Sequence, residues 1–454
     1  MNEEANSPGV ASLTLDADVV VCGGGVAGTM AAVAAARQGA SVVLVERYGF
    51  LGGNATAGAV AQFNSWQTAG GRRVIGGLAD EVVTRLKKYG AAGAHQVFVM
   101  STGHRMDRVE YAPEVLKLVF DDMLMEAGVR PMLHASILDV QCSAARDAMD
   151  GAASAPPRRH IDAVRVLTKS GIIALHPLVL IDASGDIDAL NRAGAAFLAL
   201  DEGEALQPAT MMFRFGPIDF TQFDGVSRAE IAALARRGFA EGRLARAALH
   251  ASREPFSPDA WFNISRLGVD ATDAFALGAA EMEGRRQAWS AAQFLRDAVP
   301  GCAEGRLRSF ATQVGVRETR RIEGDHILTA DELRRPEQFA DAIAAGAYPI
   351  DIHPVAGGGL QYEAMSDDHA YQIPYRSLIP LAFDNALVAG RGVSATHAAL
   401  AAIRVMTISM AVGQAAGTAA ALAAAAGAGK SAEVRAVPVA TLRAALLRDG
   451  ACLA

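Results

Sequence analysis

Apolar runs separated by turns organise the beginning of the chain. An apolar run at 19–22 ends in a glycine turn, small residues dominate 26–36, and a second apolar run covers 42–45. An apolar run without alternation is typical of a strand buried on both faces of a parallel sheet. The pattern predicts a strand, a helix and a second strand between residues 16 and 54, which is how an α/β fold begins.

The pattern changes in the middle of the chain and then returns. Residues 131–180 indicate strands, interrupted at 143–159 by a segment typical of a surface loop. Charge increases between 200 and 371, and an apolar strand follows at 386–389. Helices are predicted at 112–127, 227–248, 270–299 and 410–425. A βαβ beginning, an intervening block and a βα ending together predict one domain interrupted by another.

The glycine turn after the first strand carries the strongest chemical signal. It has the spacing Gly23-x-Gly25-x-x-Gly28. Gly23 makes the tight turn, Gly25 lets the backbone approach a pyrophosphate, and Gly28 lets the helix pack against the strand. Glu46 lies 18 residues after Gly28, at the end of the second strand, where a carboxylate can accept both ribose hydroxyls. The arrangement predicts a dinucleotide site, and both NAD and FAD satisfy it.

Further segments carry a resemblance to a known family. They run from Glu46 to Thr56, from Val179 to Asp186 and from Ile373 to Ala420. Through these segments together the chain resembles the FAD-dependent oxidoreductases of glutathione-reductase-like topology, in particular the bacterial FAD-dependent oxidoreductase group. The resemblance implies that the nucleotide is FAD.

The resemblance also implies which residues contact FAD. Gly52 and Gly53 would bring backbone close to the adenosine or the phosphates. Arg391 would neutralise phosphate, although an ordinary surface arginine is the alternative. The wider superfamily often has an acidic residue here to hold a ribityl hydroxyl, and Ser394 or Thr396 would have to replace it. The expected FAD-binding residues are Gly23, Gly25, Val26, Ala27, Gly28, Glu46, Arg47, Gly52, Gly53, Asn54, Ala183, Gly185, Asp186, Gly390, Arg391 and Met406.

The resulting fold expectation is an α/β protein with a discontinuous Rossmann-like FAD domain. This domain is expected to consist of residues 14–199 and 372–430. An α+β substrate domain is expected at 200–371, and a helical tail at 431–454. The helix at 410–425 would direct its N-terminal dipole at the N1–C2=O edge of the flavin.

His353 is the main candidate for an acid–base group, because imidazole titrates near neutral pH. Asp351 lies two residues away, so in an extended segment it would share a face with His353 and orient it. The resemblance places a similar Asp-x-His stretch on the substrate side, and a purely structural histidine is the alternative. His397 follows the 386–389 strand and is a second candidate for reaching the flavin.

The segment 316–321 resembles an arginine-rich segment of the family's middle domain. In one interpretation Arg320 clamps a carboxylate or another anion of the substrate, because a guanidinium matches that geometry. In the other, the segment forms ion pairs with Glu318 or Glu323 at the domain contact. Tyr375 begins the returning strand and is expected to line the same cavity, although packing explains this residue equally well.

Composition and short motifs bear on the partners, the metal content and the location of the protein. A net charge of −7 without a long run of Lys or Arg favours neither nucleic acid nor an anionic membrane as a partner. The four cysteines form no CxxC pair and no HExxH motif occurs, so no metal site is expected. Residues 408–427 are uncharged, but their Ala and Gly content with Gln414 and Thr418 favours a buried helix over a membrane span. The polar beginning shows no secretory signal, so we expect a cytoplasmic protein.

These observations favour FAD-dependent oxidation of a small polar metabolite, with hydride from an alcohol or amine carbon passing to flavin N5. The alternatives are reduction or isomerisation of an unsaturated substrate, and a non-catalytic protein that keeps the nucleotide as a structural element. Because no second glycine fingerprint occurs, oxygen, a quinone or a partner protein is expected as electron acceptor. The sequence leaves the substrate and the oligomeric state open, and the arginine-rich segment allows an anionic substrate.

Overall fold

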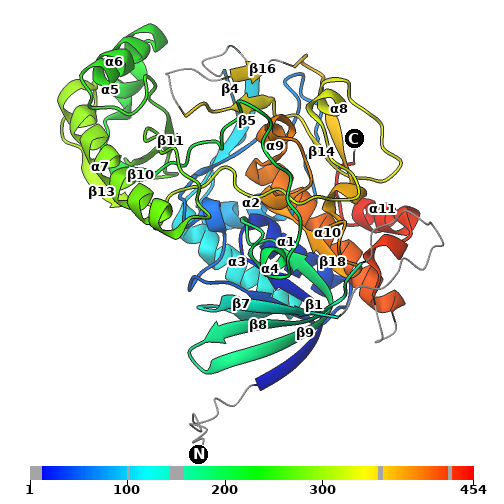
Figure 1. Cartoon of the computed structure of the whole chain (residues 1–454). Helices are drawn as coiled ribbons and strands as arrows, with labels where there is room; N and C mark the ends of the chain where they lie inside the picture. The colour runs from blue at the N-terminus through cyan, green and yellow to red at the C-terminus, as the bar shows by residue number, and fades with distance from the viewer. Residues whose placement is uncertain are drawn as a thin grey trace, which may run out of the picture.

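The structure is a computed structural model that describes residues 13–99, 103, 105–143, 158–355, 361–363, 365–427 and 432–453. Most of the surface loop expected at 143–159 therefore lies outside the described residues. Figure 1 shows a strand layer at one side, helices packed on it, and a second group of strands and helices beyond them.

A seven-stranded sheet joins the two ends of the chain. Its strand order is β6-β2-β1-β9-β8-β7, and β18 also pairs with β9. The pairs among β6, β2, β1, β9 and β18 are parallel, whereas β7, β8 and β9 are antiparallel neighbours. The strands span Leu13–Cys22 (β1), Val42–Val45 (β2), Arg130–Met132 (β6), Ser136–Cys142 (β7), Ile161–Thr168 (β8), Gly171–Asp182 (β9) and Ala386–Val388 (β18). The expected α/β class with segments from both ends of the chain is confirmed.

The apolar run in β1 is explained by burial on both faces. Val19 and Val21 belong to the larger hydrophobic core, whereas Val20 and Cys22 belong to a smaller core on the opposite face. Successive side chains of a strand point to opposite faces, so a strand covered on both sides has no polar positions.

Helices cover the face of the sheet that carries the larger core (Figure 1). The helices against the strands span Val26–Arg37 (α1), Pro113–Ala127 (α3) and Met406–Ala426 (α10). Two more helices, Leu78–Lys88 (α2) and Val439–Arg448 (α11), pack against α10. Within the described part of the chain, α10 is the one helix long and apolar enough to cross a membrane, and 83% of its most apolar window is buried inside the protein. α10 is therefore a buried core helix, as the sequence predicted.

A separate core lies around a four-stranded antiparallel sheet of order β11-β12-β10-β13. These strands span Phe213–Gly216 (β10), Ala251–Arg253 (β11), Ala260–Phe262 (β12) and Arg306–Phe310 (β13), and the helices beside them Phe220–Gly225 (α5), Arg228–Ala240 (α6) and Ala274–Ala298 (α7). α6 ends well before the predicted residue 248, because the chain turns at Gly242, whose φ is +68°. α7 begins after Asp273, whose side chain caps it, and not at residue 270.

The remaining elements are short. They are β3 (Gln62–Asn64), β4 (Gln96–Val99), β5 (Arg105–Glu110), β14 (Ala342–Gly346), β15 (Ile350–Ile352), β16 (Gln361–Glu363), β17 (Tyr371–Pro374), α4 (Asp188–Arg192), α8 (Ala330–Arg334), α9 (His397–Ile403), and the 3-10 turns η1 (Gly53–Ala55), η2 (Tyr375–Leu378), η3 (Gly390–Gly392) and η4 (Val434–Ala436). Ile343 and Tyr371 belong to the larger core, so part of the segment 200–371 packs with the helices of the main sheet. The domain boundaries given above remain predictions.

Candidate active site

The turn between β1 and α1 leaves open space in front of a helix N-terminus. Gly23 has a φ of +101°, and a Cβ added at Gly28 would lie 1.9 Å from the Gly23 carbonyl oxygen. These two positions therefore require glycine. A Cβ added at Gly25 would meet nothing within 4 Å, so the backbone before Val26 and Ala27 faces free space. Unpaired N–H groups at a helix N-terminus attract a phosphate.

Glu46 is buried at the end of β2 beside this turn. Its Oε2 accepts a hydrogen bond from the Gly24 N–H at 2.7 Å, and its Oε1 accepts one from the Tyr48 N–H at 2.9 Å. A carboxylate has about four acceptor positions, so both oxygens can accept a further hydroxyl. The neighbouring Arg47 points toward the segment that follows β13, where its guanidinium donates to the Gln313 side chain at 3.0 Å.

The loop at Gly52–Asn54 lies directly against the glycine turn. The Gly52 N–H donates to the Gly24 carbonyl at 2.7 Å, and a Cβ at Gly53 would lie 3.1 Å from the Gly25 Cα. Asn54 donates to the Val316 carbonyl at 2.8 Å and lines the large cavity described below. The loop therefore links the glycine turn to that cavity.

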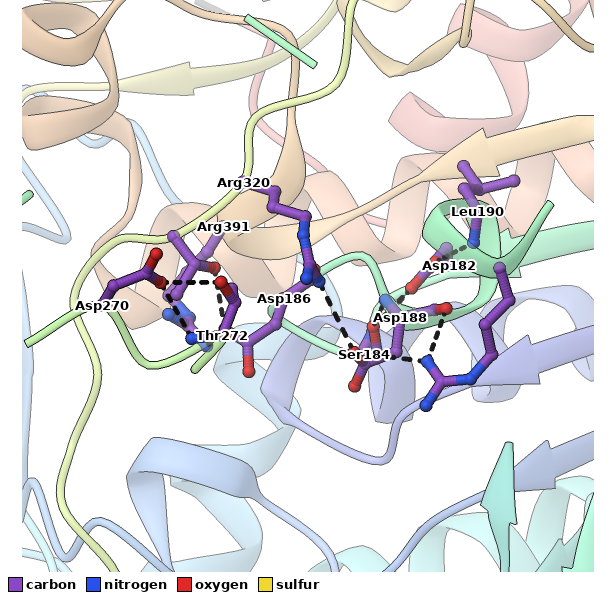
Figure 2. A network of polar contacts seen from close by, with 11 residues as sticks. Asp182, Ser184, Asp186, Asp188, Leu190, Asp270, Thr272, Arg320 and Arg391 are labelled. Atoms are coloured by element: carbon purple, nitrogen blue, oxygen red, sulfur yellow. Dashed lines mark hydrogen bonds and ion pairs between the residues drawn. The ribbon is translucent and has the colours of Figure 1, made fainter. Parts of the chain in front are cut away.

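The turn after β9 completes the cradle and carries the polar network of Figure 2. A Cβ at Gly23 would lie 2.5 Å from the Ala183 carbonyl oxygen, so this turn touches the glycine turn. Buried Asp182 accepts hydrogen bonds from Ser184 and from the Leu190 N–H, and burial raises the pKa of its carboxyl. Asp182 thus holds the shape of the turn that carries Gly185 and Asp186.

Arg391 and Arg320 both converge on Asp186 (Figure 2). Arg391 pairs with the Asp186 carboxylate at 2.9 Å, and Arg320 donates to the Asp186 carbonyl at 3.0 Å. Arg391 also lines the cavity, and its Nη1 is buried without a hydrogen-bond partner in the described structure. Arg320 does not line the cavity, because it is held by Asp186 and lies over the Phe197 ring. The expectation of a substrate clamp therefore does not hold for Arg320.

The packing of α1 against α10 brings the C-terminal segment to the same site. A Cβ at Gly413 would lie 2.1 Å from the Ala27 carbonyl oxygen, and one at Gly417 would lie 2.0 Å from that of Ala31. Gly390, with a φ of +80°, lies against the Ala27 side chain. The first turn of α10, with Met406, lines the cavity. The two helices thus fix the cavity relative to the glycine turn.

A cavity of about 360 Å³ lies between the larger core and the core around the four-stranded sheet. Its wall comes from distant segments: β3–β5, the chain before β11, the segment after β13, β15 and the beginning of α10. Its charged and titratable side chains are Arg108, Arg246, His250, Arg317, Tyr348, Asp351, His353, Arg391 and Arg404. In the described part of the chain, no group of three His, Cys, Asp or Glu side chains could hold a metal ion.

Asp351 and His353 form a hydrogen-bonded pair in this cavity, as the two-residue spacing predicted. The His353 Nε2 lies 3.2 Å from the Asp351 Oδ2, which also accepts from the Tyr348 hydroxyl at 2.9 Å. Burial alone would raise the pKa of Asp351, but His353 and Arg404 hold it well below its ordinary value. Because Asp351 is ionised, the His353 Nε2 carries the proton and Nδ1 keeps its lone pair.

The surroundings keep both cavity histidines neutral. Burial and the Arg317 guanidinium lower the pKa of His353 to about 3 in spite of Asp351. Burial and the Arg108 guanidinium lower the pKa of His250 to about 4, and its Nε2 lies 3.1 Å from the Gln62 amide nitrogen. The sequence interpretation did not identify His250, because its local pattern has no signal beyond a histidine before a short strand.

Two other predicted side chains lie away from the cavity. His397 is buried, and its Nδ1 lies 2.8 Å from the Glu318 carboxylate. Tyr375 is buried in η2, where its hydroxyl donates to the Val434 carbonyl at 2.8 Å. Neither lines the cavity, so the expected cavity contact of Tyr375 does not hold, and the approach of His397 to the flavin stays a prediction. Ser394 and Thr396 are likewise occupied within the protein, by the Gly324 N–H and the Ala399 N–H.

The parallel sheet and the glycine turn, with a cavity beside them, define an α/β dinucleotide-binding protein. The chain matches the model of the FAD dependent oxidoreductase family over residues 18–446, and it belongs to that family. FAD is accordingly its cofactor. The glutathione-reductase-like detail of the topology remains a prediction. No curated protein sequence matches the chain.

Several solved structures are similar to the chain at low sequence identity. A geranylgeranyl bacteriochlorophyll reductase-like protein from Thermoplasma acidophilum is 11% identical, with a TM-score of 0.46 over 91% of this chain and 79% of that one. A p-nitrophenol 4-monooxygenase from Pseudomonas putida is 10% identical, with a TM-score of 0.46 over 96% of this chain and 88% of that one. L-proline dehydrogenase from P. horikoshii is 10% identical, with a TM-score of 0.43 over 96% and 99%.

The residues of the site fit FAD. Open space lies before α1 for a pyrophosphate, Glu46 keeps free acceptor positions for a ribose, and the buried Arg391 Nη1 has no partner among the described residues. Asn54, Arg391 and Met406 belong both to the expected FAD contacts and to the cavity wall. The cavity therefore shares part of its wall with the residues expected to contact FAD.

Proposed function

We propose that the protein oxidises a small polar metabolite and that His353 takes the proton from its hydroxyl or amine. The observation that carries the proposal is the Asp351–His353 pair in a cavity whose wall includes Arg391 and Met406. FAD, when bound, supplies the hydride acceptor. A neutral imidazole with a free Nδ1 can accept a proton within hydrogen-bond reach.

The neighbours of His353 have separate tasks in this proposal. Asp351 accepts the Nε2 proton and so fixes the ring, as a carboxylate does for a catalytic histidine. Tyr348 donates to the same carboxylate, and Arg404 donates to the Asp351 carbonyl at 3.3 Å. These contacts hold Asp351 in place and, through it, the His353 ring.

The proposed FAD contacts follow the cradle described above. The N-terminus of α1, with Gly25, Val26 and Ala27, would face the pyrophosphate, and Glu46 would accept the ribose hydroxyls. Arg391 would donate a hydrogen bond from its unpartnered Nη1, and the dipole at the beginning of α10 would favour negative charge at the flavin. The remaining members of the proposed set are Gly23, Gly28, Arg47, Gly52, Gly53, Asn54, Ala183, Gly185, Asp186, Gly390 and Met406.

Anaerobic reduction of the bound flavin tests the proposed reaction. The FAD-loaded protein is mixed without oxygen with a panel of hydroxy acids, amino acids and sugars, and the flavin absorbance is followed. At least one compound is expected to bleach it, because an oxidised substrate must leave its electrons on the flavin. A flavin that stays oxidised with the whole panel, but is bleached by a saturated acid that is converted into the unsaturated acid, would indicate a reductase working in reverse.

Glu46→Gln is expected to weaken FAD binding by about tenfold to a hundredfold, because a hydrogen bond to a charged acceptor contributes about 1.5–3 kcal/mol. The measurement is FAD release on dilution of the loaded protein, followed by flavin fluorescence. Glu283→Gln is the control, since Glu283 lies exposed on α7 and outside the site. Equal FAD retention by the Glu46 variant and the control would remove the ribose contact from the proposal.

The pH profile of kcat/KM should lack the fall below about pH 6.5 that protonation of an ordinary histidine causes. The proposed base is active when neutral, and the pKa of His353 is lowered to about 3, so it stays neutral as the pH falls through 6.5. We expect kcat/KM, which reports the free enzyme, to change less than about threefold between roughly pH 5.5 and 7.5. The substrate chosen must not titrate in that window. A tenfold loss per pH unit below about 6.5 would contradict the assignment.

A further inference from the structure

The charged side chains of the cavity are mostly cationic. Arg108, Arg246, Arg317, Arg391 and Arg404 line it, and Asp351 is the one carboxylate in the described wall. Burying several guanidinium groups around one space is costly unless opposite charge is present. The arrangement therefore raises the question of which anion completes it.

Two of these arginines already have an acidic partner outside the wall. Arg108 pairs with Glu110 at 3.0 Å, and Arg391 pairs with Asp186 at 2.9 Å. Their charges are thus balanced by the protein itself.

The other three, Arg246, Arg317 and Arg404, line the same cavity as Asp351. Arg404 and Arg246 both lower the pKa of Arg317, and among the described residues Asp351 is the one carboxylate that raises the pKa of Arg246 or Arg317. Burial lowers the pKa of Arg317 to about 9 and that of Arg246 to about 10, which still leaves both charged at neutral pH.

The cavity therefore carries an excess of two positive charges. Three guanidinium groups stand against the Asp351 carboxylate, and His250 and His353 are neutral near pH 7 because burial lowers the pKa of both. A monoanion would balance half of this excess, and a dianion would balance all of it.

The unused hydrogen-bond donors point to the same conclusion. The Nε atoms of Arg246 and Arg404 are buried without a partner in the described structure. Arg317 uses Nη1 for the Pro208 carbonyl and the Thr210 hydroxyl, the latter at 2.7 Å. Guanidinium groups bind carboxylate and phosphate oxygens through paired N–H donors.

The wall also offers polar atoms for an uncharged part of a ligand. The amide oxygens of Asn64 and Asn263 are buried without a hydrogen-bond partner among the described residues, and both side chains line the cavity. A hydroxyl donor on the ligand would satisfy one of them. A hydroxyl is a better match than an ammonium group, which would cancel one of the two negative charges.

We propose that the cavity binds a dianionic substrate that carries a hydroxyl, with Arg246, Arg317 and Arg404 as its binding residues. This inference rests on the proposed function, because it takes the cavity to be the substrate site. A hydroxylated dicarboxylate and a phosphate monoester of an alcohol share the required charge, and the experiment separates them.

The test compares inert ligands that differ by one charge, using calorimetry on the FAD-loaded protein at about pH 8. Malonate is paired with its monoamide, malonamate, and methyl phosphate is paired with methyl sulfate. Within at least one pair, the dianion should bind about tenfold more tightly or better, the increment of one charged hydrogen bond. Preference for malonate identifies a dicarboxylate site, and preference for methyl phosphate identifies a phosphate site.

Arg246→Gln is expected to reduce the affinity for the preferred dianion by about tenfold to a hundredfold and to change that of its monoanion much less. Arg236→Gln is the matched control, because Arg236 lies exposed on the nearby α6 outside the cavity. Affinities within about threefold in both ligand pairs, or no measurable binding of any of them, would overturn the inference. An equal loss in the two variants would also overturn it.

The outcomes for the reaction are separate from those for binding. Tight dianion binding without flavin bleaching by any dianionic alcohol would leave the binding inference standing and contradict the proposed oxidation. Bleaching by a neutral metabolite, with no preference for dianions, would support the oxidation and overturn the inference.

Discussion

His353→Asn is expected to slow anaerobic flavin reduction by about a hundredfold to ten-thousandfold, the usual contribution of a positioned acid–base group. Asparagine keeps a polar side chain of similar reach but cannot accept a proton. Substrate affinity and FAD content should change little, because the arginines of the cavity and the glycine turn are untouched. The measurement is the rate constant of flavin bleaching in a stopped-flow instrument at saturating substrate.

His176→Asn provides the control for this variant. His176 lies on β9 at the position paired with Asp16, toward the end of the sheet away from the glycine turn, so its replacement should leave the rate unchanged. If the His353 variant bleaches within about threefold of the control, the proton must go to another group or to water.

Asp351→Asn belongs to the same experiment because it separates orientation from proton transfer. The variant retains an oxygen that can accept from the His353 Nε2–H, but the negative charge facing Arg404 is lost. A smaller loss of rate than in the His353 variant is therefore expected. A loss as large would show that the ionised pair, and not the imidazole alone, performs the proton transfer.

Gly413→Ala is expected to lower the free energy of unfolding by about 1–3 kcal/mol and to reduce the FAD retained per chain. The added methyl would lie 2.1 Å from the Ala27 carbonyl oxygen, which is backbone and cannot move aside as a side chain can. α10 would have to shift away from α1, and the glycine turn lies at the beginning of α1. Denaturant unfolding and the flavin-to-protein absorbance ratio measure the two effects.

Gly278→Ala is a closely matched control, because Gly278 also lies in a helix, α7, and a Cβ there would meet nothing within 4 Å. Alanine should stabilise that helix by about 0.5–1 kcal/mol. The difference between the two variants therefore isolates the contact between α1 and α10 from helix propensity. Equal stability and equal FAD content in both would contradict the close approach of the two helices.

The glycine turn and the Asp351–His353 pair were predictable because their geometry is local. Three glycines at fixed spacing between a strand and a helix determine a turn whatever the rest of the chain does. Residues two apart in an extended segment share a face, and the structure places both side chains in the cavity. The covered sheet was predictable for a similar reason, since an apolar strand without alternation must be buried on both faces.

The direction of other side chains could not be predicted from their neighbours in sequence. Arg317 and Arg320 belong to one short segment, yet Arg317 lines the cavity and Arg320 is held by Asp186. His397 follows a predicted flavin-side strand but faces buried Glu318. Each of these outcomes depends on which distant element packs against the segment.

By itself the sequence determined an α/β protein with a dinucleotide turn and a neighbouring Asp351–His353 pair, because short spacings and the burial of single strands encode these features. Only the tertiary structure decided that Arg246, Arg317 and Arg404 meet around Asp351. These residues come from three separate parts of the chain. They share one charge environment only because the larger core and the core around the four-stranded sheet pack on either side of one cavity.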